Sequence, residues 1–152
     1  MTLTQKETGL LKDLAGQETL CRDKYNKYSK EACSAELKEL FSQMATCEQN
    51  HLNTINAMLS GTVPKAPTGL SGENNSLCKK VCYNDESSRN IDKFLLSDML
   101  AMEKHASSLY DTSVFEFCDP SARKMLNHIQ SEEQQHGEKI YAFMSANGFY
   151  QG

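Results

Sequence analysis

The sequence predicts an all-α protein, a four-helix bundle made of two helical hairpins that are joined by a long crossover connection. Three observations lead to this prediction. Four stretches of the chain carry apolar residues at steps of three and four, the spacing of a helix that packs along one face. The second pair of stretches repeats the first at one fixed offset, which maps position 18 onto position 103. Between the pairs lies a segment rich in glycine and proline, which is typical of a connection.

The first hairpin is expected over residues 5–60. Thr4 and Glu7 match a capping box, which satisfies free amide donors at a helix start, so a helix is predicted from about 5 to 33. Ser34 is a suitable cap for the second helix. The expected inner-face positions of the two helices are Leu11, Leu14, Glu18, Cys21, Tyr25 and Tyr28, followed by Leu37, Phe41, Met44, Glu48, His51, Ile55 and Met58.

The crossover is expected over residues 61–90. Gly61 is a plausible helix stop, because glycine tolerates the left-handed conformation that ends many helices. A loop this long is unusual in a compact domain, and a chain that must travel back along a bundle before its third helix explains it. Residues 78–82 are expected to form a short helical turn, and Cys78 and Cys82 either form a disulfide or have no special role.

The second hairpin is expected over residues 91–147, with the third helix starting between Ser88 and Asp92. Asp119 followed by Pro120 is a strong start for the fourth helix, which should stop at residues 147–148. The expected inner-face positions are Leu96, Met99, Glu103, Ala106, Tyr110, Ser113 and Phe117, followed by Ala122, Leu126, Ile129, Glu133, His136, Ile140 and Phe143.

The two hairpins are an internal repeat, and a pseudo-two-fold axis is expected to relate them. Many residues are identical at equivalent positions of the two copies. The identical pairs include Leu11 with Leu96, Glu18 with Glu103, Tyr25 with Tyr110, Glu48 with Glu133, His51 with His136, and Ile55 with Ile140.

Composition fits a single domain over residues 1–152, with 39% hydrophobic residues. The net charge of −4 gives no reason to expect nucleic acid as a partner. No apolar run is long enough to cross a membrane, and the N-terminal residues lack the apolar core of a signal peptide. We therefore expect a cytoplasmic protein, and a homo-oligomer is compatible with the sequence.

Six ionisable residues fall on the predicted inner faces, and they are the candidate metal ligands: Glu18, Glu48, His51, Glu103, Glu133 and His136. In each hairpin a lone Glu precedes a Glu-x-x-His, and the spacing between them is the same in both copies. A Glu and a His at i and i+3 point from one face of a helix. The fold would therefore bury four carboxylates and two imidazoles in one layer, which is prohibitively unfavourable without a counter-charge.

Two divalent cations would neutralise four carboxylates, and neutral imidazoles add no charge. Oxygen-rich ligation with one nitrogen per metal favours iron, with manganese as the alternative. Glu48 and Glu133 are the expected bridges between the two metals. The competing interpretation is a bundle that holds these carboxylates protonated or hydrated without metal.

Tyr25 and Tyr110 lie two turns after the lone Glu of their own helices. They are either core residues with hydrogen-bonded hydroxyls, or partners that orient a ligating carboxylate, or redox-active phenols. His105 and His128 lie off the inner faces and are expected on the surface. Cys47, which precedes Glu48, also lies off the inner face.

The six-residue pattern resembles the ferritin-like superfamily of di-iron carboxylate proteins, in which all six positions match ligands and Tyr25 matches an orienting position. The stretches 98–105 and 132–141 and the ending 148–150 look like the coat F family of bacterial spore coat proteins. This second resemblance covers about residues 92 to 150 and implies deposition in the spore coat. The extra helix of storage ferritins and the paired Cys-x-x-Cys of rubrerythrins do not occur in this sequence.

Two hypotheses about function remain open at this point, and no catalytic residue is assigned. The first is a di-iron oxidoreductase or ferroxidase-like protein that acts on O2 or peroxide. The second is a structural spore coat protein, with other coat proteins as partners, whose metal site stabilises the fold or is vestigial. A helical adaptor without metal is a third, weaker interpretation.

Overall fold

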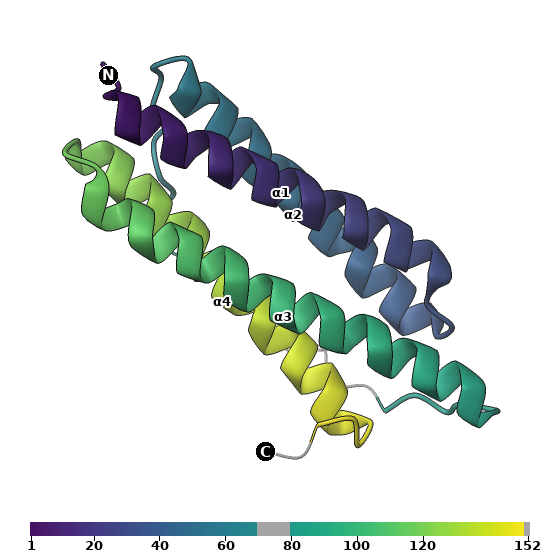
Figure 1. Cartoon of the computed structure of the whole chain (residues 1–152). Coiled ribbons are helices and arrows are strands. Elements are labelled where there is room, and N and C mark those ends of the chain that lie inside the picture. Colours follow the sequence, from purple (N-terminus) through teal and green to yellow (C-terminus); the bar gives the residue numbers. More distant parts are fainter. Residues whose placement is uncertain (70–79, 151–152) are drawn as a thin grey trace.

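Four α helices form the part of the chain that the computed structural model describes, residues 1–69 and 80–150, and these residues contain no strand (Figure 1). The helices are α1 (Gln5–Glu31), α2 (Ala35–Leu59), α3 (Glu86–Glu116) and α4 (Pro120–Ala146). Helix α1 pairs with α2, α3 pairs with α4, and α1 also packs against α3. The predicted all-α four-helix bundle is confirmed. None of the described helices is long and apolar enough to cross a membrane.

The predicted helix starts are confirmed at three of the four helices. Thr4 and Glu7 form the capping box of α1, and the Ser34 hydroxyl accepts the Leu37 amide at the start of α2. Asp119 caps α4, with Pro120 as its first residue. Helix α3 differs, and the predicted start at residues 88–92 and the hairpin boundary at 91 were wrong.

Asp85 caps α3, so this helix starts at Glu86, ahead of the predicted range. The Asp85 carboxylate accepts the Ser88 amide at 2.7 Å and the Ser88 hydroxyl at 3.0 Å. The polar residues 85–88 carry no apolar periodicity, so the sequence pattern did not include this first turn. Helix α1 is also shorter than predicted and ends at Glu31, ahead of residue 33.

The described parts of the crossover connection, residues 61–69 and 80–85, contact residues at or near the termini of the chain. At its start, the amino group of Met1 donates to the Gly61 carbonyl oxygen at 2.9 Å, and Gly61 adopts a φ of 93°. At its end, the Val81 amide donates to the side chain of Asn147, which follows α4. Residues 80–82 are not helical, so the predicted helical turn is wrong for them. Cys82 is an exposed free thiol, whereas Cys78 lies outside the described residues.

Buried carboxylates from one hairpin fix the turn of the other. Asp92 on α3 is fully buried and accepts the amides of Cys33 and Ser34, at 2.7 and 3.0 Å, in the turn between α1 and α2. Glu7 on α1 accepts the amide of Cys118, in the turn between α3 and α4, at 3.3 Å. Glu7 and Asp92 occupy equivalent positions in the sequence repeat, as do Cys33 and Cys118. These reciprocal contacts are what a pseudo-two-fold relation between the hairpins requires.

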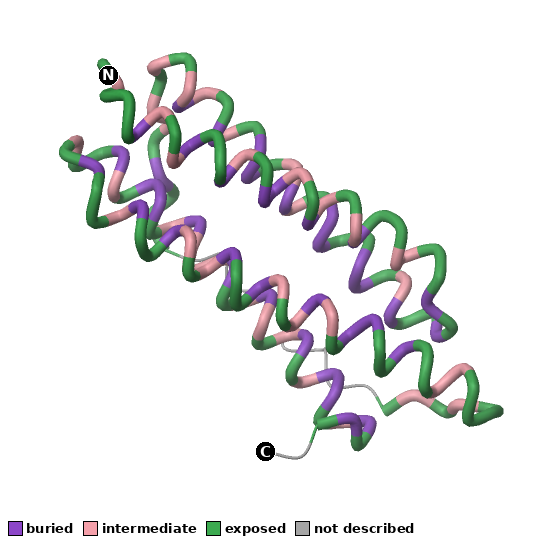
Figure 2. The backbone as a smooth tube through the Cα atoms, in the orientation of Figure 1, coloured by how far each residue is buried: buried purple, intermediate pink, exposed green. Residues whose placement is uncertain are grey.

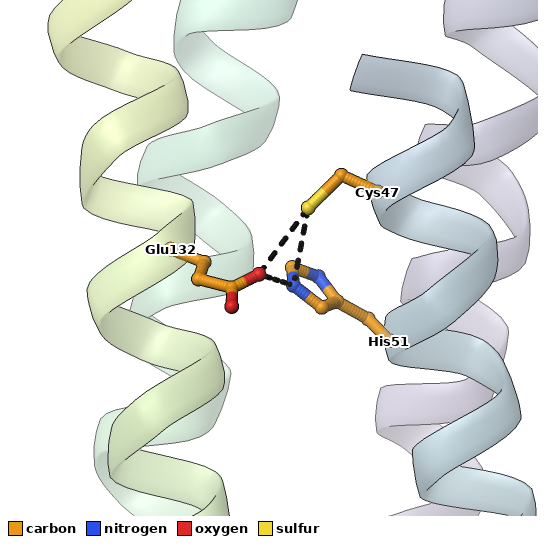
Figure 3. Close-up of side chains that lie close together, drawn as sticks. All are labelled: Cys47, His51 and Glu132. Atoms are coloured by element: carbon orange, nitrogen blue, oxygen red, sulfur yellow. Dashed lines mark hydrogen bonds and ion pairs between the residues drawn. The ribbon is translucent and has the colours of Figure 1, made fainter. Parts of the chain in front are cut away.

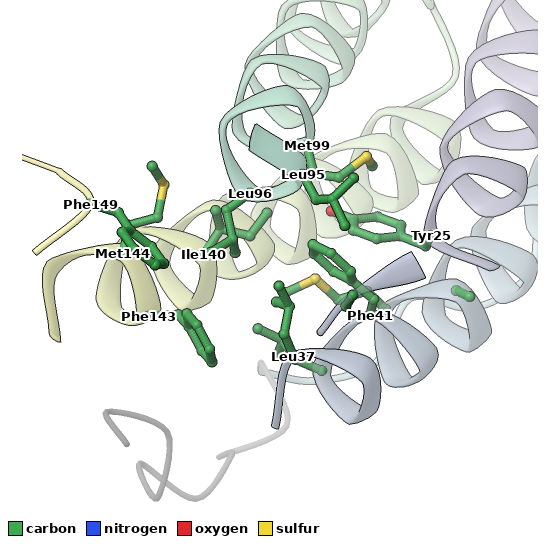
Figure 4. Close-up of a cluster of buried hydrophobic side chains, with 14 residues drawn as sticks. Tyr25, Leu37, Phe41, Leu95, Leu96, Met99, Ile140, Phe143, Met144 and Phe149 are labelled. Carbon is green, nitrogen blue, oxygen red and sulfur yellow. The ribbon is translucent and has the colours of Figure 1, made fainter. Parts of the chain in front are cut away.

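Buried residues recur along all four helices (Figure 2). Among the described residues the apolar ones form two clusters, one toward each end of the bundle. One cluster, drawn in Figure 4, contains Tyr25, Leu37, Phe41, Leu96, Met99 and Ile140 among others. The other contains Leu11, Leu14, Ile55, Tyr110, Leu126 and Ile129 among others. The predicted inner-face positions therefore supply the core, and the ionisable residues lie between the two clusters.

Candidate metal centre

The six predicted ligands come together in one buried layer at the middle of the bundle. Each of the four helices contributes at least one of them, and each is at most 4% exposed: Glu18 on α1, Glu48 and His51 on α2, Glu103 on α3, Glu133 and His136 on α4. Their burial follows from the same helical periodicity that buries the apolar clusters on either side. Metal binding in this layer stays a prediction.

The first ring nitrogen of each histidine faces the carboxylates. His51 Nδ1 lies 3.1 Å from Glu133 Oε1, 3.5 Å from Glu48 Oε2 and 3.6 Å from Glu18 Oε2. On the other side of the layer, His136 Nδ1 lies 2.8 Å from Glu48 Oε1.

The remaining contacts of His136 complete the equivalent arrangement. Its Nδ1 lies 3.3 Å from Glu103 Oε1 and 3.5 Å from Glu133 Oε2. The candidate ligands form two groups, and within each group the donor atoms lie within 4.8 Å of one another. One group contains Glu18, Glu48, His51 and Glu133. The other contains Glu48, Glu103, Glu133 and His136. Glu48 and Glu133 belong to both groups, which is the position that bridging carboxylates would occupy.

The donor set fits divalent cations better than it fits an internal hydrogen-bond network. Five carboxylate oxygens among the described buried atoms accept no hydrogen bond of normal geometry, namely Glu18 Oε2, both oxygens of Glu48, Glu103 Oε2 and Glu133 Oε2. Glu48 Oε1 is among them, although His136 Nδ1 lies 2.8 Å away. Buried polar atoms are normally paired, because an unpaired one loses its solvation without compensation. All five belong to the candidate ligands, so the oxygens that lack a well-aligned hydrogen-bond donor are concentrated where two cations would lie.

The electrostatics of the layer show strong interactions among its ionisable groups. Burial acts to lower the pKa of both histidines, but the surrounding carboxylates raise it well above the usual value. Burial raises the pKa of Glu48 to about 8, and the neighbouring Glu18 carboxylate adds to this shift. Burial and the charge of Glu133 raise the pKa of Glu103 to about 8. Burial acts to raise the pKa of Glu18 too, but Glu48 and the imidazole of His51 lower it below its usual value. The four carboxylates cannot all ionise together at neutral pH without added positive charge.

Tyr25 and Tyr110 contact the candidate ligands. Such contacts are required by the interpretation that these tyrosines orient a ligating carboxylate. Both are fully buried. The Tyr25 hydroxyl donates to Glu103 Oε1, and the Tyr110 hydroxyl donates to Glu18 Oε1. Each tyrosine thus reaches the carboxylate of the other hairpin and not the Glu of its own helix. Burial and the nearby carboxylates raise the pKa of both phenols, so they stay protonated as donors.

Three residues beside the layer were not predicted as site residues: Cys47, His128 and Glu132. The second ring nitrogen of His51, Nε2, lies 2.8 Å from Glu132 Oε2, and His128 Nε2 lies 2.6 Å from Glu132 Oε1. Figure 3 shows Glu132 reaching from α4 toward Cys47 and His51 on α2. The predicted surface position of His128 was wrong, because its side chain is only 13% exposed, whereas His105 is exposed as predicted.

Two signals in the sequence point to these residues in retrospect. Cys47 and Glu132 immediately precede the two predicted bridging glutamates, so they occupy equivalent positions in the repeat. His128 and Glu132 are one helical turn apart, at i and i+4, so they face each other on one helix.

Two pockets reach the layer from outside. One, of about 690 Å³, lies along α3 and α4 and includes Glu103, Glu133, Leu100, Gly137 and Tyr141 in its lining. The other, of about 280 Å³, lies between α2 and α4 and is lined by Cys47, Glu132, His136, Met44 and Lys139 among others. The first offers a route for small molecules to two candidate ligands, and the second a route to the outer side of the histidines.

Comparison with known families gives a match to the second half of the chain. The family model of the Coat F domain matches residues 91–151, which include most of α3 and all of α4. This match confirms the predicted closeness of the second hairpin to the coat F family. The matched region contains Glu103, Glu133 and His136. No curated protein and no solved structure matches the chain.

Proposed function

We propose that this chain is a ferritin-like di-metal protein related to the coat F family, which binds two divalent ions in the buried layer. Iron is the proposed metal and manganese the alternative. The observation that carries the proposal is the set of five carboxylate oxygens that accept no hydrogen bond of normal geometry, buried beside two imidazole nitrogens on four helices. Two divalent cations supply four positive charges, which match the four carboxylates of the layer.

The residues divide into distinct roles in this proposal. Glu48 and Glu133 would span the two ions, because their oxygens face both groups of donors. The other four residues are the terminal ligands, each of which would bind one ion only. Glu18 and His51 would complete the coordination of one ion, and Glu103 and His136 that of the other. Carboxylate oxygens with imidazole nitrogens suit iron and manganese.

Neighbouring residues would hold these ligands in position. Tyr110 and Tyr25 each donate to one oxygen of a terminal carboxylate, which leaves the other oxygen, Oε2, directed to the layer. Glu132 Oε2 lies 2.8 Å from His51 Nε2 and would accept a proton held there, which would keep the lone pair of Nδ1 available for an ion. Such outer contacts fix the tautomer and the ring orientation of a ligating histidine.

Two bound iron ions would supply electrons for the reduction of O2 or peroxide, as in a ferroxidase. The pocket along α3 and α4 supports this chemistry, since it connects the surface with Glu103 and Glu133. A second candidate function, a structural spore coat protein whose metal site stabilises the bundle, is supported by the Coat F match. Both candidates require metal, and they differ in whether the metal reacts.

Exposure of the iron-loaded protein to oxidants separates the two candidates. The protein is loaded with Fe²⁺ without oxygen, and its optical spectrum is followed after O2 or peroxide is added. Oxidation that is faster than that of the same Fe²⁺ in buffer, and that is lost in Glu133→Ala, supports the ferroxidase-like function. Iron that binds but does not react faster than free Fe²⁺ supports the structural function. Glu39→Ala, an exposed glutamate on α2, is the control variant.

A further inference from the structure

A second group of possible ligands lies outside the buried layer, on the side of His51 that faces away from it. Cys47 and His51 are one turn apart on α2, and Glu132 approaches them from α4 (Figure 3). Cys47 Sγ lies 3.6 Å from His51 Nε2 and 3.3 Å from Glu132 Oε2, and His51 Nε2 lies 2.8 Å from Glu132 Oε2. A thiol, an imidazole and a carboxylate therefore converge on one point.

These separations resemble the edges of a tetrahedral metal site. Ligand atoms that share a zinc ion, at bond lengths of about 2.0–2.3 Å, lie about 3.3–3.6 Å from one another. The two separations that involve Cys47 Sγ already have these values. Only the contact between His51 and Glu132 has to open, by about half an ångström, and the Glu132 side chain is a quarter exposed and has room to move.

From these observations we infer an outer cation site, formed by Cys47 Sγ, His51 Nε2 and Glu132. It would take a borderline-soft divalent cation such as Zn²⁺, because thiolate and imidazole ligands favour that class over Mg²⁺ or Mn²⁺. With three protein ligands, the fourth position stays open for water. This site is distinct from the proposed di-metal centre, although both use His51.

The surroundings support a site that is held in place and open to solvent. His128 lies 2.6 Å from the other oxygen of Glu132, and such a partner orients a ligating carboxylate. Cys47 and Glu132 line the pocket between α2 and α4, so a cation can reach them without crossing the buried layer. The sequence repeat does not supply this site twice, because Cys47 has Glu132 as its equivalent in the other half.

The outer site and the buried layer compete for His51, because a neutral imidazole has only one nitrogen lone pair to offer to a cation. On binding, the Cys47 thiol loses its proton to solvent and His51 offers the lone pair of Nε2. The single ring proton then lies on Nδ1, where Glu133 Oε1, at 3.1 Å, accepts it. A neutral His51 that holds the outer cation therefore cannot ligate an ion in the layer.

Cobalt absorption tests the outer site without any assay of activity. Co²⁺ bound by a thiolate gives a charge-transfer band in the near ultraviolet, which oxygen and nitrogen ligands do not give. We expect the reduced protein to show this band, Cys47→Ser to lose it, and Glu132→Gln to weaken cobalt binding at least about tenfold. Cys33→Ser, which changes an exposed thiol in a turn, is the matched control and should keep the band. Absence of the band from the unmodified protein, or its persistence in Cys47→Ser, would overturn the inference.

Alkylation of the unmodified protein gives a test that does not depend on the folding of variants. Iodoacetamide is added with and without Zn²⁺, and the modification of each cysteine is measured by mass spectrometry. Zn²⁺ should slow the alkylation of Cys47 about tenfold or more and leave that of Cys33 and Cys118 unchanged. Equal alkylation of Cys47 in both conditions would overturn the inference.

Discussion

The hydroxyl of Tyr110 on α3 donates a hydrogen bond to the carboxylate of Glu18 on α1, so the two hairpins are joined at the candidate metal centre itself. The repeat makes this contact reciprocal, since Tyr25 on α1 donates to Glu103 on α3. Each terminal carboxylate thus receives its tyrosine hydrogen bond from the other hairpin. The layer therefore depends on the docking of one half against the other.

Loss of the Tyr110 hydroxyl should weaken both the fold and metal binding. In Tyr110→Phe, Glu18 loses its donor inside the core, which should lower the free energy of unfolding by about 1–3 kcal/mol. Iron affinity should fall about 10- to 100-fold, because the carboxylate is no longer oriented. Urea unfolding and iron titration measure the two effects. Tyr141→Phe, at an exposed position on α4, is the control, and equal behaviour of the two variants would contradict this role.

Stability of the protein stripped of metal should fall as pH rises. The pKa values of Glu48 and Glu103 are raised to about 8 from 4.5. A raised pKa means that the folded state binds protons more tightly than the unfolded state, so this contribution is complete below about pH 4.5 and is lost as pH approaches 8. Thermal unfolding at a series of pH values, in the presence of a chelator, measures the change.

Metal should reverse this dependence. Cations compete with the protons on Glu48 and Glu103, so iron or manganese affinity should rise with pH up to about 8. The difference in melting temperature between loaded and stripped protein should grow over the same range. A difference that is independent of pH would show that binding does not displace these protons.

Filling the pocket along α3 and α4 should slow access to the layer. Gly137 lines this pocket, and a Cβ built on it meets no atom within 4 Å. Gly137→Leu should therefore fold normally and slow the oxidation of bound Fe²⁺ by several-fold, measured by stopped-flow absorbance. Gly16→Leu, on an exposed part of α1 with equal space, is the control and should not slow it. Equal oxidation rates in the two variants would exclude this route.

The buried Asp92 carboxylate should contribute far more to stability than a surface aspartate of the same helix. Asp92→Ala leaves the amides of Cys33 and Ser34 without their acceptor and should cost about 2–4 kcal/mol of unfolding free energy. Asp111→Ala, at an exposed position of the same helix, should change the unfolding free energy by about 0.5 kcal/mol or less. Urea unfolding of both variants tests the comparison, and similar losses would contradict it.

Helical periodicity was sufficient to predict most of the fold. Steps of three and four residues identify the face that each helix buries, and caps such as Ser34 and Asp119 identify three of the four starts. The six candidate ligands could be predicted because they interrupt the apolar faces at repeated positions. Periodicity fails at the first turn of α3, where polar residues follow the cap at Asp85.

Contacts between helices could not be predicted in the same way. Spacing along a helix gives the direction of a side chain but not its partner on another helix. Tyr110 was therefore placed relative to Glu103 of its own helix, whereas its contact is with Glu18. His128 was expected on the surface for the same reason, because only the approach of α2 to α4 makes Glu132 a link between His128 and His51.

The central claim is that the buried layer binds two metal ions that Glu48 and Glu133 bridge. Equilibrium dialysis of the protein against Fe²⁺ without oxygen, followed by elemental analysis, tests it most directly. We predict about two iron ions per chain in the unmodified protein and loss of both in Glu48→Ala. Failure of the unmodified protein to bind iron or manganese, or retention of one or both ions by Glu48→Ala, would contradict the claim.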